Sequence, residues 1–222
     1  LVIDWRGQGL SDRPDWDRRM GHVEDFTDYQ HDLRAALSAG RALGLPEPYV
    51  ALSHSMGGAI ALRAVMGDHP FAAAVFSAPM WGISLRPIEA PVARPFAALA
   101  AAVGLGRRYV PGTEARNYLE IAPFEGNALT TDRAMWDMMR QQLATHPDLA
   151  LGGPSLNWLH AAFRETAALA QMPSPALPCL TVVGGRERVV VVPRIEARMA
   201  AWPGGTLLRE PDAEHEVMMD RA

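Results

Sequence analysis

The segment Ser53–Gly58 has the residue types that a nucleophilic serine needs at a sharp turn. It reads Ser-His-Ser-Met-Gly-Gly and follows the apolar run 49–52, which is typical of a buried strand. A nucleophilic serine must project its oxygen from a tight strand-to-helix turn, so the residues two positions away on either side must be small. Those residues are Ser53 and Gly57. We therefore expect Ser55 to be a nucleophile; the competing interpretation is a glycine-capped turn with an exposed serine.

Ser53 departs from the common form of this turn, Gly-x-Ser-x-Gly, which has glycine at that position. Serine is small enough for the crowded site, but it tolerates a positive φ far less well than glycine does. We therefore expect that the backbone at Ser53 does not need a positive φ.

A serine hydroxyl is a poor nucleophile near neutral pH and needs a base, which a carboxylate must orient. Only His215 among the seven histidines follows the last predicted strand, so we expect it to be the base, and we assign His54 to packing. Glu187 follows an earlier strand and is the expected acid. Asp212 is an alternative acid, but it shares a loop with His215, from where the far imidazole nitrogen is awkward to reach.

The remaining chemistry of this site concerns the oxyanion that forms during acyl transfer. The backbone N–H of Met56, directly after the nucleophile, is one expected donor. The second donor belongs to a loop that would precede Leu1.

For Glu187, the competing interpretation is a surface salt bridge with Arg186 or Arg188. No pair of histidines has zinc-ligand spacing around a glutamate, so we expect no metal and no cofactor.

Short apolar runs that alternate with helical patterns must position these residues. Continuously apolar strands separated by helices indicate a mostly parallel sheet with helices on both faces, which is an α/β fold. Ligand and catalytic groups then belong at the carboxyl ends of the strands. We expect strands at 1–3, 49–52, 72–76, 179–183 and 206–208, and helices at 24–43, 59–65, 133–144 and 156–170.

The stretch 81–172 has helical patterns but no clear strand, so we predict that it is an inserted helical cap. Residues 1–80 and 173–222 are then the two parts of the core. Apolar cap side chains would shape a substrate pocket, and an interpretation as cap core competes for each of them. The candidates for substrate binding are Trp136, Met139 and Trp158.

Composition restricts the class of protein. The chain has 222 residues and a net charge of −4 with no run of like charges, so we expect no nucleic-acid partner. The single cysteine, Cys179, lies in an apolar run and is expected to be a small buried hydrophobe. No apolar stretch of 18 residues and no signal peptide is visible. Oligomeric state is left open. We expect a cytoplasmic protein or one peripheral to a membrane.

Several motifs resemble those of the α/β-hydrolases, in particular the lysophospholipase and monoacylglycerol-lipase branch. They are Asp4-x-Arg6-Gly7-x-Gly9-x-Ser11, the segment Ser53–Gly58, the stretch from His146 to Trp158, Glu-Arg-Val-Val at 187–190 and Glu-His-Glu at 214–216. The resemblance implies the α/β-hydrolase fold and places Ser55, Glu187 and His215 on the catalytic positions. It also implies that this chain lacks the first strands and the last helix of the fold, which fits the abrupt start at Leu1.

The resemblance further implies an ester of a glycerolipid with one acyl chain as the substrate, with an acyl-enzyme on Ser55. The cap could also contact a membrane surface peripherally. Alternatives are a general carboxylesterase, an aminopeptidase, and a non-catalytic binding protein on a hydrolase scaffold. An aminopeptidase would need cap carboxylates for the substrate ammonium, and the candidates are Glu114, Glu120, Glu125 and Glu165.

Overall fold

The computed structural model describes residues 1–86 and 88–220, which form two compact units. The first unit comprises residues 1–44, 85–124 and 136–164, and the second comprises residues 45–84, 125–135 and 165–222. Each unit is built from segments that lie far apart in the sequence.

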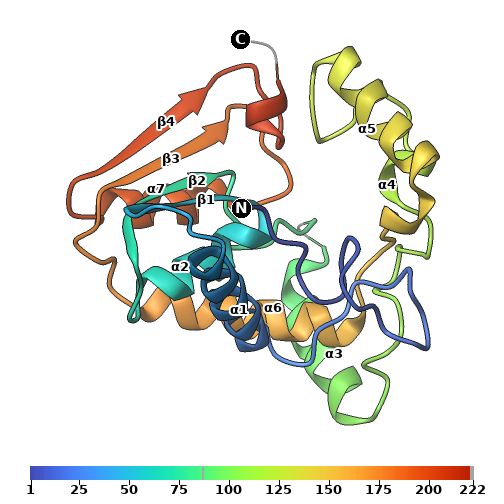
Figure 1. Ribbon diagram of the computed structural model, residues 1–222. Coiled ribbons are helices and arrows are strands. Elements are labelled where there is room, and N and C mark those ends of the chain that lie inside the picture. The colour runs from blue at the N-terminus through green and yellow to red at the C-terminus, as the bar shows by residue number, and fades with distance from the viewer. Residues whose placement is uncertain (87, 221–222) are drawn as a thin grey trace. The chain divides into compact units, whose positions relative to one another are not determined.

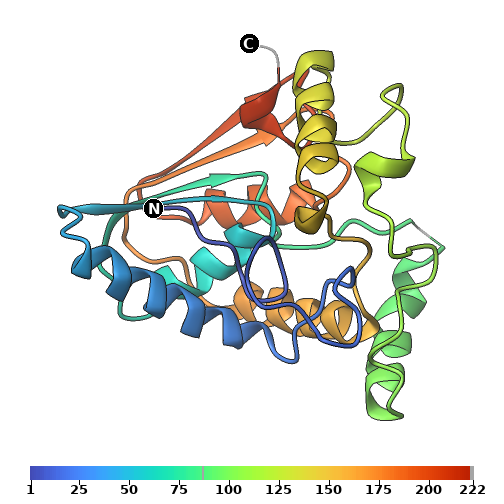
Figure 2. The same cartoon turned by 45° about the vertical axis from the view of Figure 1, so that its right-hand side comes forward.

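The second unit contains a parallel sheet of four strands in the order β1-β2-β3-β4. Leu52 of β1 lies beside Val75 of β2, and Val75 lies beside Leu180 of β3, so the strands end at one common edge. The two views in Figures 1 and 2 show the strands side by side. All four strands were predicted. Their bounds are Tyr49–His54 (β1), Phe71–Ser77 (β2), Cys179–Gly184 (β3) and Gly205–Glu210 (β4).

Helices α2 (Met56–Val65) and α7 (Val192–Ala200) connect neighbouring strands of this sheet. Both crossovers step in the same direction along the sheet, so their right-handedness places both helices on one face. Thr181 of β3 points to this face, where its hydroxyl lies 3.1 Å from the sulfur of Met199 in α7. The core of the unit lies here; its fully buried side chains include Phe76, Val183, Ile60, Leu62 and Ile195.

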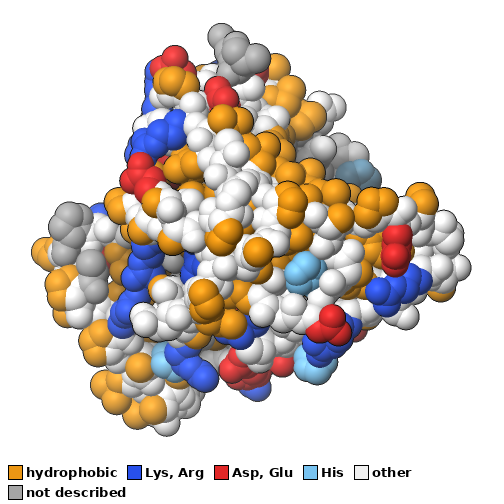
Figure 3. All heavy atoms as spheres, turned by 90° about the vertical axis from the view of Figure 1, so that its left-hand side faces the viewer, with side chains coloured by type: hydrophobic (Ala, Val, Ile, Leu, Met, Phe, Trp, Pro, Cys, Tyr) orange, Lys and Arg blue, Asp and Glu red, His pale blue; other side chains and the backbone are white. Residues whose placement is uncertain are grey.

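The opposite face of the sheet carries the alternate side chains. Val50 and Leu52 of β1 are 55% and 63% exposed, and Leu208 of β4 is 45% exposed. Hydrophobic side chains reach the surface in groups in the space-filling view of Figure 3. Apolar residues therefore do not all lie in the core of this structure.

Cys179 begins β3 and is buried, as its apolar surroundings in the sequence predicted. Burial raises the pKa of its thiol to about 11, although a contact with the Thr181 hydroxyl acts in the other direction. The thiol form therefore predominates at neutral pH, and Cys179 acts as a small packing residue.

The predicted strand at 1–3 does not form. Leu1 and Val2 are 70% and 95% exposed, and the described chain has no strand paired with them. An apolar run becomes a strand only where its backbone finds a partner in a ladder of hydrogen bonds. Residues 1–3 have the composition of a strand, but no described segment pairs with them.

In the first unit, helix α1 (Tyr29–Ala42) follows the short 3-10 turn η1 (Phe26–Asp28). The Asp25 side chain caps this turn by accepting a hydrogen bond from the Thr27 N–H at 2.9 Å. The helix ends near the predicted position: Ala42 is its last residue, Leu43 follows, and Gly44 then has a φ of +71°.

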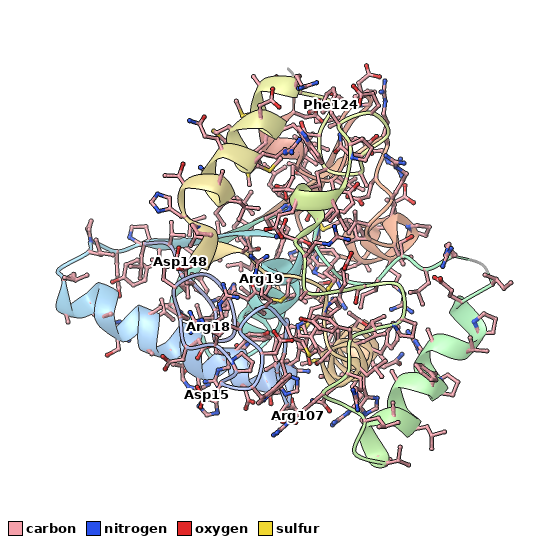
Figure 4. The ribbon with its side chains drawn as sticks, turned by 90° about the vertical axis from the view of Figure 1, so that its right-hand side faces the viewer. Asp15, Arg18, Arg19, Arg107, Phe124 and Asp148 are labelled. Carbon is pink, nitrogen blue, oxygen red and sulfur yellow. The ribbon has the colours of Figure 1, made fainter. Side chains whose placement is uncertain are left out.

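The N-terminal loop of this unit is fixed by arginines. Arg6 donates to Asp32 of α1 at 2.8 Å, and the buried Arg13 donates to the carbonyls of Gly9 and Arg18 at 2.8 and 2.9 Å. Arg19 pairs with Glu120 at 2.7 Å. Backbone oxygens and carboxylates thus order a loop without regular structure; it carries Asp15, Arg18 and Arg19, which are labelled in Figure 4.

The described residues between β2 and β3 contain helices and no named strand, as the sequence predicted for most of this stretch. The helices predicted at 133–144 and 156–170 are α5 and α6. Among the described residues, no helix is long and apolar enough to cross a membrane. The bounds are Ala90–Ala102 (α3), Tyr118–Ile121 (α4), Arg133–Thr145 (α5), Pro147–Leu149 (η2) and Leu156–Gln171 (α6), and a final turn, η3, spans Val217–Met219.

Candidate active site

Ser55 occupies the sharp turn between β1, which ends at His54, and α2, which begins at Met56. Its backbone has a φ of 49° and a ψ of −118°, which is rare for a residue other than glycine. The Ser55 N–H donates to the carbonyl of Ser77 at 3.0 Å, and its carbonyl accepts from Met80 N–H at 2.9 Å. A strained residue held by such bonds is typical of functional sites.

The small residues around Ser55 allow this turn to form. Ser53 lies within β1 without a positive φ, so the prediction for this position is confirmed. Its hydroxyl donates to the Val75 carbonyl at 3.4 Å. A Cβ on Gly58 would lie 2.5 Å from the Pro79 Cβ, closer than real side chains approach. Gly58 is therefore required for the start of α2 to pack against the loop after β2.

The structure brings Ser55, His215 and Glu187 together in one hydrogen-bonded chain within the second unit. The His215 Nε2 lies 2.9 Å from the Ser55 Oγ, and its Nδ1 lies 2.7 Å from the Glu187 Oε2. The side chains of His215 and Glu187 are 4% and 0% exposed. A histidine between a serine hydroxyl and a buried carboxylate can accept the serine proton while the carboxylate fixes its tautomer.

Glu187 is held as a carboxylate. Its burial opposes the charge, but hydrogen bonding and attraction from His215, together with two backbone donors, outweigh it and lower the Glu187 pKa. The donors are the N–H groups of Val189 and Val190, at 2.6 and 3.1 Å from Oε1. One carboxylate oxygen is thus fixed by the backbone, and the other remains for His215.

The alternative partners of these groups are engaged elsewhere. Asp212 pairs with Arg186 at 2.7 Å, and its side chain is 85% exposed. Arg188 pairs with Glu214 at 3.1 Å. Neither arginine therefore forms the salt bridge with Glu187 that was the competing interpretation. Asp212 pairs with Arg186, and the carboxylate that contacts His215 is that of Glu187.

Two glycines allow the loop that carries Glu187 to approach the loop that carries His215. A Cβ on Gly184 would lie 2.3 Å from the Ala213 carbonyl oxygen, and a Cβ on Gly185 would lie 2.3 Å from the Pro211 carbonyl oxygen. The backbones also exchange hydrogen bonds, such as Arg186 N–H to the Ala213 carbonyl at 3.0 Å. Close backbone packing therefore sets the distance between the acid and the base.

A segment that sequence reasoning missed holds the His215 loop from another direction. The N–H groups of His215 and Glu216 donate to the carbonyls of Ala128 and Leu129 at 3.3 and 2.7 Å. Asp220 accepts from the Thr131 N–H at 2.9 Å. These contacts join residues nearly 90 positions apart. No periodicity or motif in the sequence signals them.

Sequence reasoning also assigned His54 to packing, yet it contacts charged groups. Its ring centroid lies 4.8 Å from that of His215, and its Nε2 lies 3.2 Å from the Glu216 Oε1. The only sequence signal was that His54 adjoins the proposed nucleophile and that Glu216 adjoins the proposed base.

The other predicted site residues lie as follows. Met56 is the first residue of α2, where backbone N–H groups carry partial positive charge. Trp136 is fully buried and packs edge-on against Tyr118 and Phe124, the latter labelled in Figure 4. Met139 and Trp158 are partly exposed, and Trp158 packs against Phe26. These three cap candidates belong to the first unit, whereas Met56 belongs to the second.

Comparison with known sequences gives matches along the whole chain. A family model described as "Serine aminopeptidase, S33" matches residues 1–222. The probable lysophospholipase L2 of Haemophilus influenzae is 30% identical over 226 residues, which cover 100% of this chain and 69% of that protein. Lysophospholipase L2 of Escherichia coli K12 is 34% identical over 232 residues, covering 100% of this chain and 67% of that protein.

Solved structures show the same fold at lower sequence identity. A soluble variant of monoglyceride lipase from Saccharomyces cerevisiae has a TM-score of 0.68 at 22% identity, over 98% of this chain and 70% of that one. A monoacylglycerol lipase from Paleococcus ferrophilus has a TM-score of 0.65 at 18% identity, over 98% and 75%. A carboxyl esterase from Bacillus coagulans has a TM-score of 0.66 at 15% identity, over 95% and 71%.

Proposed function

Because the chain belongs to the α/β-hydrolase family described as serine aminopeptidase, S33, we propose that it cleaves an ester of a single-chain lipid through an acyl-enzyme on Ser55. The fold class and the family suggested by the sequence motifs are confirmed. The observation that carries the proposal is the hydrogen-bonded chain from Ser55 through His215 to Glu187. Relatives named lysophospholipase and neighbours named monoacylglycerol lipase support a lysophospholipid or a monoacylglycerol as the substrate.

The proposed reaction follows from the geometry of these side chains. The His215 Nε2 takes the Ser55 proton as Oγ attacks the ester carbonyl, and Glu187 stabilises the resulting imidazolium. The Met56 N–H stabilises the oxyanion of the tetrahedral intermediate. His215 then gives its proton to the leaving alcohol oxygen as the C–O bond breaks. Water attacks the acyl-enzyme in the same way and releases the fatty acid and Ser55.

The carboxylates that an aminopeptidase would need are largely engaged. Glu165 is buried and paired with Arg63 at 2.5 Å. Glu120 pairs with Arg19 at 2.7 Å, and Glu114 pairs with Arg116 at 2.7 Å. The fourth candidate, Glu125, is exposed. Three of the four carboxylates are thus already paired with an arginine. This supports an ester as the substrate over a peptide whose N-terminal ammonium group would need a free carboxylate.

The cap helix α3 supports contact with a lipid surface. Its exposed face carries large apolar side chains three or four residues apart, and the helix contains no acidic residue. Such a face partitions into the boundary between lipid headgroups and acyl chains. We expect the protein to co-sediment with phosphatidylcholine vesicles, and the variant Leu99→Asp to co-sediment less. Equal sedimentation of the two proteins would show that this face of α3 does not bind lipid. The apolar side chains are Val92, Phe96, Leu99 and Val103.

The acyl pocket that the sequence predicted in the cap remains part of the proposal. Met139 and Trp158 are partly exposed and are its candidate lining residues. The complete burial of Trp136 supports the competing interpretation as cap core for that residue.

A substrate comparison tests the proposed function. We expect kcat/KM on lysophosphatidylcholine or a monoacylglycerol to exceed that on aminoacyl p-nitroanilides by at least about 100-fold, because the acyl chain supplies apolar binding energy. Short p-nitrophenyl esters should give intermediate values. A preference for the aminoacyl amides would favour the aminopeptidase. Absence of both turnover and fluorophosphonate labelling would favour a non-catalytic binding protein.

A further inference from the structure

A second histidine–carboxylate pair lies beside the proposed catalytic residues, within the same compact unit. The His54 Nε2 lies 3.2 Å from the Glu216 Oε1, and the His54 ring lies 4.8 Å from the His215 ring between centroids. The side chains of His54 and Glu216 are 25% and 24% exposed, so most of their surface is removed from water. The proposed mechanism uses neither of them.

Both ring nitrogens of His54 have polar neighbours. Its Nδ1 lies 3.3 Å from the Ser77 hydroxyl, and its Nε2 lies within ion-pair distance of the Glu216 carboxylate. These contacts hold the His54 ring between the end of β2 and the loop after β4.

Glu216 supplies a negative charge close to His215. Burial opposes this charge, but contact with His54 and attraction from His54 and His215 outweigh it and lower the Glu216 pKa, while repulsion from Glu187 acts the other way. Glu216 is thus ionised at neutral pH. His54, His215 and Glu187 are the titratable groups whose charges act on it.

The chain positions of the pair explain what the contact joins. His54 directly precedes Ser55, and Glu216 directly follows His215. A contact between their side chains therefore fixes the end of β1 to the loop after β4, next to the 2.9 Å contact between the two reacting groups.

We propose that Glu216, held by His54, is a positioning residue that fixes the His215 loop and stabilises the His215 imidazolium electrostatically, as a second carboxylate beside Glu187. This role rests on the proposed ester hydrolysis by Ser55. In the transition state His215 becomes positively charged, and a negative charge held in a partly buried site stabilises that charge more than it would in water.

The variant Glu216→Gln tests the role of the charge. Glutamine keeps the shape of the side chain but removes the charge, so the imidazolium is less stable and His215 stays neutral to lower pH. We expect kcat to fall about tenfold, KM to change by less than about twofold, and the acidic half-maximum of kcat/KM to move down by about one pH unit, since one unit corresponds to a factor of ten.

Two further variants separate this role from a structural one. Asp212→Asn removes an exposed charge from the same loop, and we expect neither kcat nor the pH profile to change, because solvent screens that position. Glu216→Asp keeps the charge and should retain the acidic half-maximum of the unaltered protein, even if its shorter side chain lowers kcat.

The contrary result is a loss of activity by the same factor at every pH in both Glu216→Gln and Glu216→Asp, or no loss in either; each would overturn the proposal. These outcomes can be told apart from a failure of the proposed function. That function fails instead if the unaltered protein does not hydrolyse the esters or if Ser55→Ala retains its activity.

Discussion

Replacing Ser55 or His215 by alanine is expected to lower kcat for ester hydrolysis by about 10⁴- to 10⁶-fold, because the nucleophile and its base act as one unit. The His215 Nε2 lies 2.9 Å from the Ser55 Oγ, so removal of either side chain ends the same proton transfer. For the same reason the double variant should be no slower than the slower single variant by more than a few-fold. Stopped assays with a p-nitrophenyl ester and a lysophospholipid measure both effects.

Folding must be unaffected for this result to identify the site. Circular dichroism and the melting temperature of each variant provide that comparison, and Ser53→Gly is a matched control in the same strand. Ser53 needs no positive φ and its hydroxyl makes only a 3.4 Å contact, so we expect the control to keep activity within a few-fold. Turnover within tenfold of the unaltered protein in Ser55→Ala or His215→Ala would remove these residues from the mechanism.

Local sequence patterns were enough to predict the elements that carry the candidate site. Each of Ser55, Glu187 and His215 follows an apolar strand, and parallel neighbours in a sheet end at the same edge. Knowing that each residue follows a strand therefore indicates that the three approach one another. The close approach of Gly58 to Pro79 is a separate constraint at the start of α2, which the expectation of small residues at positions 53 and 57 did not cover.

Contacts between distant loops could not be predicted in this way. The hydrogen bonds from His215 and Glu216 to Ala128 and Leu129 connect backbone atoms, whose chemistry is the same at every residue, so no residue type marks them. The pairing of His54 with Glu216 depends on the direction in which two side chains leave their turns. Such directions follow from tertiary packing and not from composition or periodicity.

For the apolar run at 1–3, composition predicted a strand that the structure does not contain. A strand is a property of a pair of segments, and no described segment pairs with this run. By contrast, β1 has the same kind of composition and does form a strand, because β2 lies beside it in register from Val50 to His54. Composition thus indicates what a segment is suited to form, while its neighbours decide whether it forms.

The second large effect is expected for the acid. Glu187→Gln should lower kcat by about 10³- to 10⁴-fold, because an amide can neither fix the tautomer of His215 nor stabilise its imidazolium as a carboxylate does. Asp212→Asn should change kcat by less than about twofold, since Asp212 is 85% exposed and pairs with Arg186. Steady-state kinetics of the two variants on the same ester measure this difference; a larger loss in Asp212→Asn than in Glu187→Gln would move the acid to Asp212.

The pH dependence of the Glu187 charge adds a further comparison. The Glu187 pKa lies below its ordinary value of 4.5, so the carboxylate stays ionised as the pH falls from neutral to 4.5 and is protonated only below that value. Glu187 therefore keeps its charge between neutral pH and about 4.5, so a loss of activity in that range does not come from protonation of Glu187. In Glu187→Gln the stabilising charge is absent, so the imidazolium forms less readily and the acidic half-maximum of kcat/KM should move to lower pH, as a pH profile of the residual activity would show. An unchanged half-maximum would mean that Glu187 does not act on His215 electrostatically, despite the 2.7 Å between the two side chains.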